Sequence, residues 1–338
     1  MGKSVIITGG AGYLGSRLTE ILLHAGYSVN AVDNLMYEQS FNDYKSMFRK
    51  FGNKYTFHLV DLRNTNSIEA LITSIDSVDA IMHFGDLSSV YACNHNPVLT
   101  QEVSRQATSQ LIELAFRSRI PVIYNSSSSL YGASKDYREW TEDDELPPLS
   151  DLYCEAKWFI ESEIIRLSSL YAEASYNIFR PATVFGQSPR FRIELLPNHF
   201  TYSAISRGRI RVSDANSNRA FISANTLCAI YHRVLDERLF KNRIYNVGSY
   251  NLSKLEISAE IQRHVPCKIV SSDETGDPRD LRIDCKRFND ELFKIPPVDL
   301  QEEIHSLAQF LKESMPIIEG TQYRSLLNMP LELWRSLI

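Results

Sequence analysis

Short apolar runs alternate with longer segments of helical periodicity through the first half of the chain. The apolar runs are Ser4–Thr8, Ser28–Val32, Tyr55–Val60, Asp79–His83, Val122–Asn125 and Tyr176–Arg180. The helical segments are Tyr13–His24, Leu99–Arg117 and Leu152–Tyr171. Strands that are apolar along their whole length and alternate with helices are typical of a parallel sheet covered on both faces. The pattern therefore predicts an α/β fold with a doubly wound parallel sheet.

The rhythm changes after Arg180. Three prolines punctuate a loop-rich stretch that continues to about Arg219. Helical periodicity returns at Ala224–Asp236, Leu252–His264 and Gln301–Leu311, with an apolar strand at Ile244–Val247. We therefore expect a main domain of residues 1–180, to which 220–250 returns. A smaller C-terminal lobe takes 181–219 and 251–315, and 316–338 form a tail.

The composition narrows the class of protein. The 338 residues are 43% hydrophobic and carry a net charge of −5, which gives no support to a nucleic-acid partner. No run of about 18 apolar residues is present, so no membrane span is expected. The five cysteines are scattered without a C-x-x-C pair. This usage predicts free thiols in a reducing compartment, the cytoplasm, and no metal site.

A glycine-rich turn follows the first expected strand. The sequence TGGAGYLG spaces Gly9, Gly12 and Gly15 as G-x-x-G-x-x-G at the start of the first helix. Glycine lets the backbone approach a pyrophosphate, and the free N–H groups at the helix start face the anion. Asp33 closes the second strand, 18 residues after Gly15. Its carboxylate can accept from both ribose hydroxyls and would repel a 2′-phosphate, so the turn predicts a Rossmann-type domain that binds NAD rather than NADP.

Further cofactor contacts are expected around this turn. Tyr13 and Leu14 lie within it, and Asn34 follows Asp33. Asp61 and Leu62 follow the third strand and could meet the adenine. A plain surface aspartate explains Asp61 nearly as well.

Several motifs together resemble the extended short-chain dehydrogenases/reductases. They are TGGAGYLGS, VDNL, VDLR, HFGD, SSSSLYG, YCEAK and FRPATVFG, in the family's order and spacing. Within that family the chain resembles the NAD-dependent nucleotide-sugar epimerase/dehydratase group, of which UDP-glucose 4-epimerase is a member. The match covers about residues 4–312. ATVFGQSPRFR, LLPNHFTY and GDPRDLR further resemble the branch of GDP-manno-heptose 4-dehydrogenase-like proteins of bacterial surface-sugar pathways.

The resemblance implies a catalytic group of Ser127, Tyr153 and Lys157. The Tyr-x-x-x-Lys pattern is by itself common on ordinary helices, and only the other motifs make it informative. Residues four apart share a helix face, so Tyr153 and Lys157 can both face the cofactor. A free tyrosine has a pKa of about 10, and the ammonium of Lys157 would lower it toward that of a useful base. Ser127 would hold the reacting oxygen, although its serine neighbours make a register error of one residue possible.

Two serines decide between the reactions of this group. Ser128 and Ser129 occupy the positions where the resembling 4,6-dehydratases have an Asp-Glu pair. Neither serine titrates near neutral pH, so dehydration is not expected. What remains is oxidation and reduction at C4 of a nucleotide-diphosphate sugar, by a 4-epimerase or a 4-dehydrogenase of surface-polysaccharide or nucleotide-sugar metabolism. The alternative is a non-catalytic NAD-binding sensor or scaffold of the same fold.

The resemblance also implies substrate contacts and a homodimer. Expected contacts are Ser128, Ser129, Thr183, Asn198, Arg219 and Arg279. For the two arginines a surface position is an equal alternative. Asp86, in HFGD, departs from the family's pattern, and the sequence does not tell what it contacts. The family pairs the helices that match Leu99–Arg117 and Leu152–Tyr171 across a dimer, and core packing is the other reading of their extra apolar residues.

Overall fold

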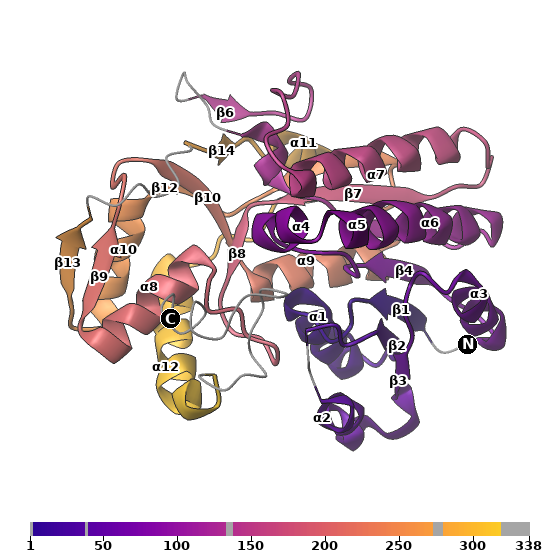
Figure 1. Ribbon diagram of the computed structural model, residues 1–338, viewed down its shortest axis with the longest axis horizontal. Helices are drawn as coiled ribbons and strands as arrows, with labels where there is room; N and C mark the ends of the chain where they lie inside the picture. Colours follow the sequence, from indigo (N-terminus) through magenta and orange to yellow (C-terminus); the bar gives the residue numbers. More distant parts are fainter. Residues whose placement is uncertain (1–2, 38–39, 133–137, 273–279, 319–338) are drawn as a thin grey trace.

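The computed structural model describes residues 3–37, 40–132, 138–272 and 280–318. A parallel sheet of seven strands runs through this part of the chain (Figure 1). Its members are β1 (Ser4–Thr8), β2 (Ser28–Asp33), β3 (Tyr55–Leu59), β4 (Ala80–His83), β5 (Val122–Asn125), β7 (Tyr176–Pro181) and β11 (Arg243–Val247). The order is β11-β7-β5-β4-β1-β2-β3, and every neighbouring pair is parallel. The expected doubly wound parallel sheet is therefore confirmed.

Successive residues of β1, an interior strand, face opposite sides of the sheet, as strand geometry requires. Val5 and Ile7 pack into one hydrophobic cluster with α1 (Tyr13–His24) and α9 (Ala224–Asp236). Ile6 packs into another cluster on the opposite face. That cluster includes residues of α3 (Thr65–Ser74), α6 (Thr108–Arg117) and α7 (Leu152–Ser168). Continuous apolar strands are needed because both faces are covered.

A third cluster forms the core of the smaller lobe, to the left in Figure 1. Its helices are α8 (Leu196–Arg207), α10 (Lys254–His264) and α12 (Leu300–Ile318). Its strands are β8 (Thr183–Phe185), β9 (Arg209–Val212), β10 (Asn218–Ser223), β12 (Tyr250–Ser253) and β13 (Lys268–Ser271). The hydroxyl of Tyr13 in α1 donates to the carbonyl of Gly186 at 2.6 Å, and thereby ties the glycine turn to this lobe.

The structure departs from the expected elements in several places. The stretch expected to be loop-rich contains α8, whose first turn holds Pro197, a position where proline costs no hydrogen bond. The helix expected at Leu99–Arg117 begins as α5 (Pro97–Leu99) and continues as a π-helix, η2 (Thr100–Ala107), before α6. Several short elements were not predicted from the sequence pattern. They are α2 (Phe41–Met47), α3 (Thr65–Ser74), α4 (Val90–His95), α11 (Lys286–Glu291), η1 (Arg49–Lys54), η3 (Ser128–Tyr131), β6 (Glu139–Trp140) and β14 (Arg282–Ile283).

None of the helices in the described part of the chain is both long and apolar enough to cross a membrane. No group of three or more histidine, cysteine or acidic side chains in the same residues is placed to hold a metal ion. All five cysteines are free thiols. The end of the expected tail, 319–338, lies outside the described residues.

Candidate active site

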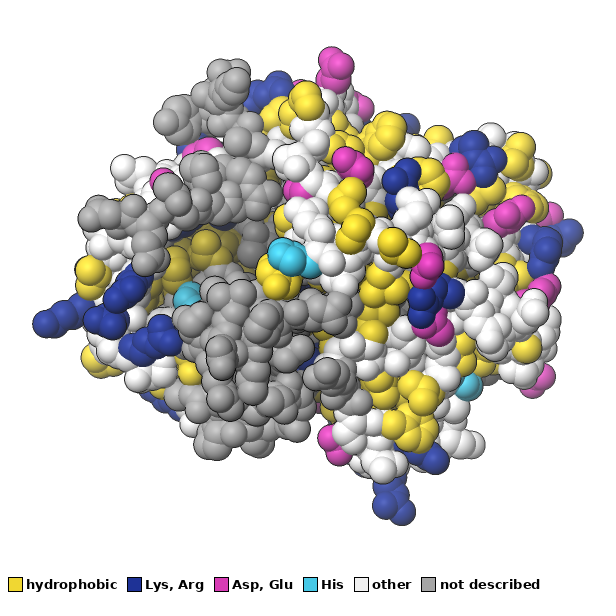
Figure 2. Space-filling view, viewed as in Figure 1, with side chains coloured by type: hydrophobic (Ala, Val, Ile, Leu, Met, Phe, Trp, Pro, Cys, Tyr) yellow, Lys and Arg dark blue, Asp and Glu magenta, His cyan; other side chains and the backbone are white. Residues whose placement is uncertain are grey.

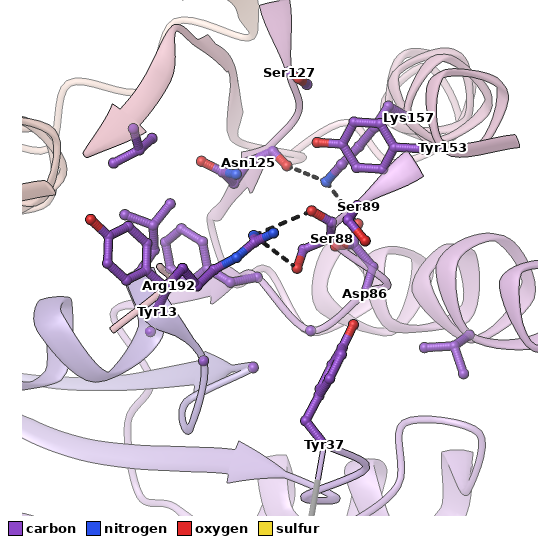
Figure 3. Close-up of a pocket in the computed structure, with 18 of the residues that line it drawn as sticks. Tyr13, Tyr37, Asp86, Ser88, Ser89, Asn125, Ser127, Tyr153, Lys157 and Arg192 are labelled. Atoms are coloured by element: carbon purple, nitrogen blue, oxygen red, sulfur yellow. Dashed lines mark hydrogen bonds and ion pairs between the residues drawn. The ribbon is translucent and has the colours of Figure 1, made fainter. Parts of the chain in front are cut away.

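A cavity of about 350 Å³ lies at the carboxyl ends of the central strands. The turn after β1, the end of β2 and the loops after β4 and β5 line it, together with Tyr153 and Lys157 of α7 (Figure 3). Arg192 and Leu195, which precede α8, reach it from the smaller lobe. This is the edge at which open parallel sheets bind their ligands.

The glycine turn is built so tightly that side chains would not fit. Gly9 has a φ of +66°, and a Cβ there would lie 2.5 Å from the carbonyl oxygen of Phe84. A Cβ on Gly15 would lie 2.1 Å from the carbonyl oxygen of Gly9. Gly12 is the N-cap of α1, whose first turn carries no acidic side chain. The cavity therefore meets a bare helix N-terminus, which suits the pyrophosphate of a dinucleotide.

Asp33 lies beside this turn with a fixed carboxylate. One oxygen accepts from the backbone N–H of Ala11 at 3.0 Å, and the other accepts from Leu35 at 2.8 Å. Burial raises the pKa of Asp33, and these two hydrogen bonds oppose the rise. The carboxylate lines the cavity and keeps lone pairs for hydroxyl donors. Its placement fits the ribose hydroxyls of NAD.

The neighbouring residues Asn34, Asp61 and Leu62 also line the cavity. The carboxylate of Asp61 accepts from Asn34 at 2.9 Å and pairs with Arg63 at 2.8 Å. The hydrogen bond from Arg63 is the main cause that holds the pKa of Asp61 at about 2. Asp61 is thus a charged wall residue whose oxygens already have protein partners.

Helix α7 presents Tyr153 and Lys157 on one face, as their spacing predicts. The helix begins at a cap in which Asp151 accepts from the N–H of Cys154 at 2.9 Å. The Ser127 hydroxyl accepts from the backbone N–H of Ser129 at 3.1 Å. The three residues expected to be catalytic therefore line the same cavity as the glycine turn.

Burial sets the protonation of Tyr153 in this structure. Burial raises the pKa of Tyr153 by more than Lys157 and Ser127 lower it, and Asp86 adds to the rise. The sequence predicts that Lys157 lowers this pKa. The lysine does so, but its effect is smaller than that of burial, so the tyrosine rests as the neutral phenol.

Asp86 is the contact that the sequence left open. Its carboxylate lies 2.8 Å from the Lys157 ammonium, and both side chains are only 4% exposed. The same ammonium donates to the carbonyl of Asn125 at 2.6 Å. Burial alone would lower the pKa of Lys157, but Asp86, Tyr124 and Tyr153 outweigh it and raise that pKa. Burial raises the pKa of Asp86, and Lys157 opposes the rise. We read the two as an ion pair, because each stabilises the charged form of the other.

The residues expected to bind the substrate do not all line the cavity. Ser129 and Thr183 line the cavity, whereas Ser128 is buried away from it. Asn198 is fully buried, and its amide accepts from the N–H of Gly186 and donates to the Arg192 carbonyl, both at 2.8 Å. It holds the loop that carries Arg192.

Of the two arginines expected at the diphosphate, Arg219 lies within the described residues and does not line the cavity. Arg219 lies buried on β10, where its guanidinium donates to the carbonyl of Asn218 at 2.8 Å. Arg279 lies outside the described residues.

Tyr37, Ser88 and Arg192 form a further polar group that lines the cavity, and the sequence did not single out Tyr37 or Ser88. Arg192 pairs with Glu194 at 2.6 Å and reaches the carbonyl and hydroxyl of Ser88 at 3.3 Å (Figure 3). The hydroxyl of Tyr37 points toward Asp86 and Ser88 from the other side (Figure 3). Burial is the main cause that raises the pKa of Tyr37 to about 12. The available signal was position, because Tyr37 and Ser88 each follow a strand at the ligand-binding edge.

Comparisons with known proteins agree with this geometry. A family model described as "NAD dependent epimerase/dehydratase family" matches residues 5–248. The chain is 34% identical over 166 residues to UDP-glucose 4-epimerase 2 of Arabidopsis thaliana. The aligned region covers 48% of this chain and 46% of that protein. The chain is 25% identical over 290 residues to UDP-glucose 4-epimerase of Yersinia enterocolitica, with 79% and 85% covered. The chain thus aligns with under half of the plant relative and most of the bacterial one.

The fold is also that of solved enzymes. The structure matches a dTDP-glucose 4,6-dehydratase from Bacillus anthracis in complex with NAD with a TM-score of 0.80, covering 93% of this chain and 98% of that one. The two sequences are 20% identical, so this likeness concerns the fold alone. The family match confirms the resemblance and the NAD cofactor that the motifs predict.

Proposed function

The chain belongs to the NAD-dependent epimerase/dehydratase family, and on this basis we propose that it oxidises and reduces C4 of a nucleotide-diphosphate sugar. One observation carries the proposal: Ser127, Tyr153 and Lys157 line one cavity with the glycine turn and Asp33. UDP-glucose 4-epimerases among the relatives support C4 as the reacting carbon. The protein acts as a 4-epimerase if it reduces the keto sugar again before release, and as a 4-dehydrogenase if it releases the keto sugar.

The residues divide the work as follows. Bound NAD supplies the acceptor and donor of hydride. Tyr153 takes the proton of the sugar hydroxyl when its carbon is oxidised, and returns a proton when the ketone is reduced. Ser127, which lines the same cavity, holds the same oxygen. Lys157 donates to a cofactor hydroxyl and stabilises the tyrosinate that forms.

Water elimination has no support in the cavity. Ser129 lines it and Ser128 is buried away from it. A hydroxyl is a poor acid and a poor base near neutral pH, so neither replaces a carboxyl pair. We therefore assign redox chemistry without dehydration, despite the shared fold with a 4,6-dehydratase.

The assembly and the substrate contacts belong to the same proposal. Trp158 and Ile165 of α7 are each 48% exposed, and Val98 of α5 is 69% exposed. Hydrophobic side chains reach the surface over these helices (Figure 2). Because such a face is suited to a subunit contact, we propose a homodimer through α5, η2, α6 and α7 in the cytoplasm. Ser129 and Thr183, which line the cavity, remain the proposed substrate contacts, together with Arg279, which lies outside the described residues.

A substrate screen tests the function. Purified protein is extracted to identify its cofactor, then given UDP-, GDP-, CDP- and dTDP-sugars while absorbance at the NADH band and NMR spectra are followed. A C4 epimer without net NADH identifies an epimerase. Accumulating NADH that an added keto acceptor clears identifies a dehydrogenase. Bound NAD with no hydride transfer from any sugar contradicts the proposal and favours a non-catalytic NAD-binding protein.

A further inference from the structure

The Asp86 carboxylate, buried in an ion pair with Lys157, adds a negative charge to the active site that the proposed reaction does not itself require. Asp86 lies just after β4, and its carboxylate touches the ammonium that faces the cofactor. A lone ammonium in a buried cavity would carry one positive charge. With Asp86 at 2.8 Å, the pair as a whole is neutral.

The hydrogen bonds of Lys157 limit what it can do for the cofactor. An ammonium has three N–H donors. Two are used by Asp86 at 2.8 Å and by the carbonyl of Asn125 at 2.6 Å. One donor is left for a ribose hydroxyl. These two hydrogen bonds fix the Lys157 side chain, so its third N–H has a defined direction before any ligand binds.

The groups around the pair bring no further charge at neutral pH. They are His83 of β4, Tyr124 of β5, Tyr153 of α7, Cys93 of α4 and Tyr37 after β2. Burial lowers the pKa of His83 to about 3, and it raises the pKa of each phenol and of the thiol. Arg192, farther along the cavity, has its own partner in Glu194.

The chemistry places the nicotinamide close to the pair. Tyr153 must reach the hydroxyl of the same carbon that exchanges hydride with the nicotinamide, and reacting atoms approach to about 3–3.5 Å. The Lys157 ammonium is 5.8 Å from the centre of the Tyr153 ring. The pair and the nicotinamide therefore lie within a few ångströms of one another, where a unit charge in a protein shifts an equilibrium by about tenfold or more.

We propose that Asp86 is a positioning residue that neutralises Lys157 and thereby makes the site favour the cationic nicotinamide of NAD⁺ over the neutral ring of NADH. Without the carboxylate, the ammonium would repel NAD⁺ and leave NADH unaffected. With the carboxylate in place, the site holds the cofactor in its oxidised form, which starts the catalytic cycle by accepting hydride from an alcohol. The inference rests on the proposed function, because that function sets which part of the cofactor faces the Asp86–Lys157 pair.

Binding of the two cofactor forms tests this proposal without turnover. Dissociation constants for NAD⁺ and NADH are measured by calorimetric titration of cofactor-stripped protein. We expect Asp86→Asn, which keeps the shape and removes the charge, to weaken NAD⁺ relative to NADH by about tenfold or more. Lys157→Met should shift the ratio the other way. The double variant Asp86→Asn/Lys157→Met, neutral again, should return to within about threefold of wild type.

The outcomes separate this proposal from the proposed function. An unchanged NAD⁺/NADH ratio in Asp86→Asn overturns it and leaves Asp86 a merely structural partner of Lys157. If Asp86→Asn does not fold, Lys157→Met and the double variant still decide, because equal ratios in those two would overturn the proposal as well. A wild-type protein that prefers NAD⁺ through Asp86 but turns over no nucleotide sugar overturns only the proposed function.

Discussion

Both oxygens of the Glu161 carboxylate accept hydrogen bonds from Arg180, at 2.9 Å from Nε and 2.6 Å from Nη2. The two side chains are 3% and 5% exposed. Glu161 lies one helical turn beyond Lys157 and also accepts from the hydroxyl of Ser126. The ion pair therefore joins the catalytic helix α7 to β7, and the Ser126 hydrogen bond joins the same helix to the residue that precedes Ser127.

Breaking this ion pair should destabilise the fold strongly. Arg180→Met leaves the Glu161 carboxylate buried without its partner, and losses of about 3–5 kcal/mol are usual for such a change. Denaturant unfolding of the variant measures the loss. Arg166→Met is the matched control, because Arg166 pairs with Glu163 on the exposed face of the same helix and should be nearly neutral. Equal effects of the two variants would show that burial of the Glu161 pair is unimportant.

Removing the Tyr153 hydroxyl should abolish most turnover and spare cofactor binding. Tyr153→Phe deletes the proposed acid–base group, and such losses are typically at least 10²-fold in rate. Tyr124→Phe controls for a lost phenol nearby, since the Tyr124 hydroxyl is buried without a hydrogen-bond partner within the described structure. Rate and NAD affinity are measured for both. Near-wild-type turnover in Tyr153→Phe would remove it from the mechanism.

Replacing Asp33 should relax the choice of cofactor. The carboxylate is held by Ala11 and Leu35 at the edge of the cavity, where it would repel a 2′-phosphate. Asp33→Ser should weaken NAD and raise the relative affinity for NADP by about tenfold or more. Titration with both dinucleotides measures the ratio. A variant that still rejects NADP as well as wild type does would place the ribose elsewhere.

Buried His83 should make the fold sensitive to acid. Thr108 donates to the carbonyl of Val103 and can accept from Nε2 of His83 at 3.1 Å, so Nδ1 accepts from Thr8 at 2.6 Å and the ring is neutral. Burial lowers its pKa to about 3, whereas an unfolded histidine titrates near 6.5. The unfolded state therefore binds the proton first, and stability contributed above pH ~6.5 is lost as the pH falls toward about 3.

A matched variant isolates that contribution. The difference in unfolding free energy between wild type and His83→Gln should shrink between pH 7 and pH 5, because only wild type carries the depressed group. Chemical denaturation at several pH values measures it. A difference that stays constant over this range would mean that His83 is protonated, or exposed, in the folded protein.

The sequence predicted most of the main sheet and the centre of the site. The features that were predicted depend on residues close together in the sequence: the apolar strands, the glycine spacing and the helical interval from Tyr153 to Lys157. Such features can be predicted without knowing how distant segments pack. Asp86 shows the limit, because its partner Lys157 lies 71 positions away and only the folded chain brings the loop after β4 to α7. Helix α8 was missed for another reason: its buried face includes Asn198 and Thr201, so apolar periodicity is weak there.

Protonation could not be predicted from neighbours alone. The sequence indicated that Lys157 lies near Tyr153, and this favours tyrosinate. Whether the phenol ionises depends on how completely the fold removes water from it and on the opposing charge of Asp86. Both are properties of the assembled cavity.

Isotope labelling shows whether hydride leaves C4 of a nucleotide sugar, as the proposed function requires. Protein carrying NAD is given nucleotide sugars deuterated at C4, and parallel samples are deuterated at C3 or C5. We expect deuterium to move from C4 to the bound nicotinamide, with slower turnover for that label alone. Transfer of label from C3 or C5, or turnover without any transfer from C4, would contradict it.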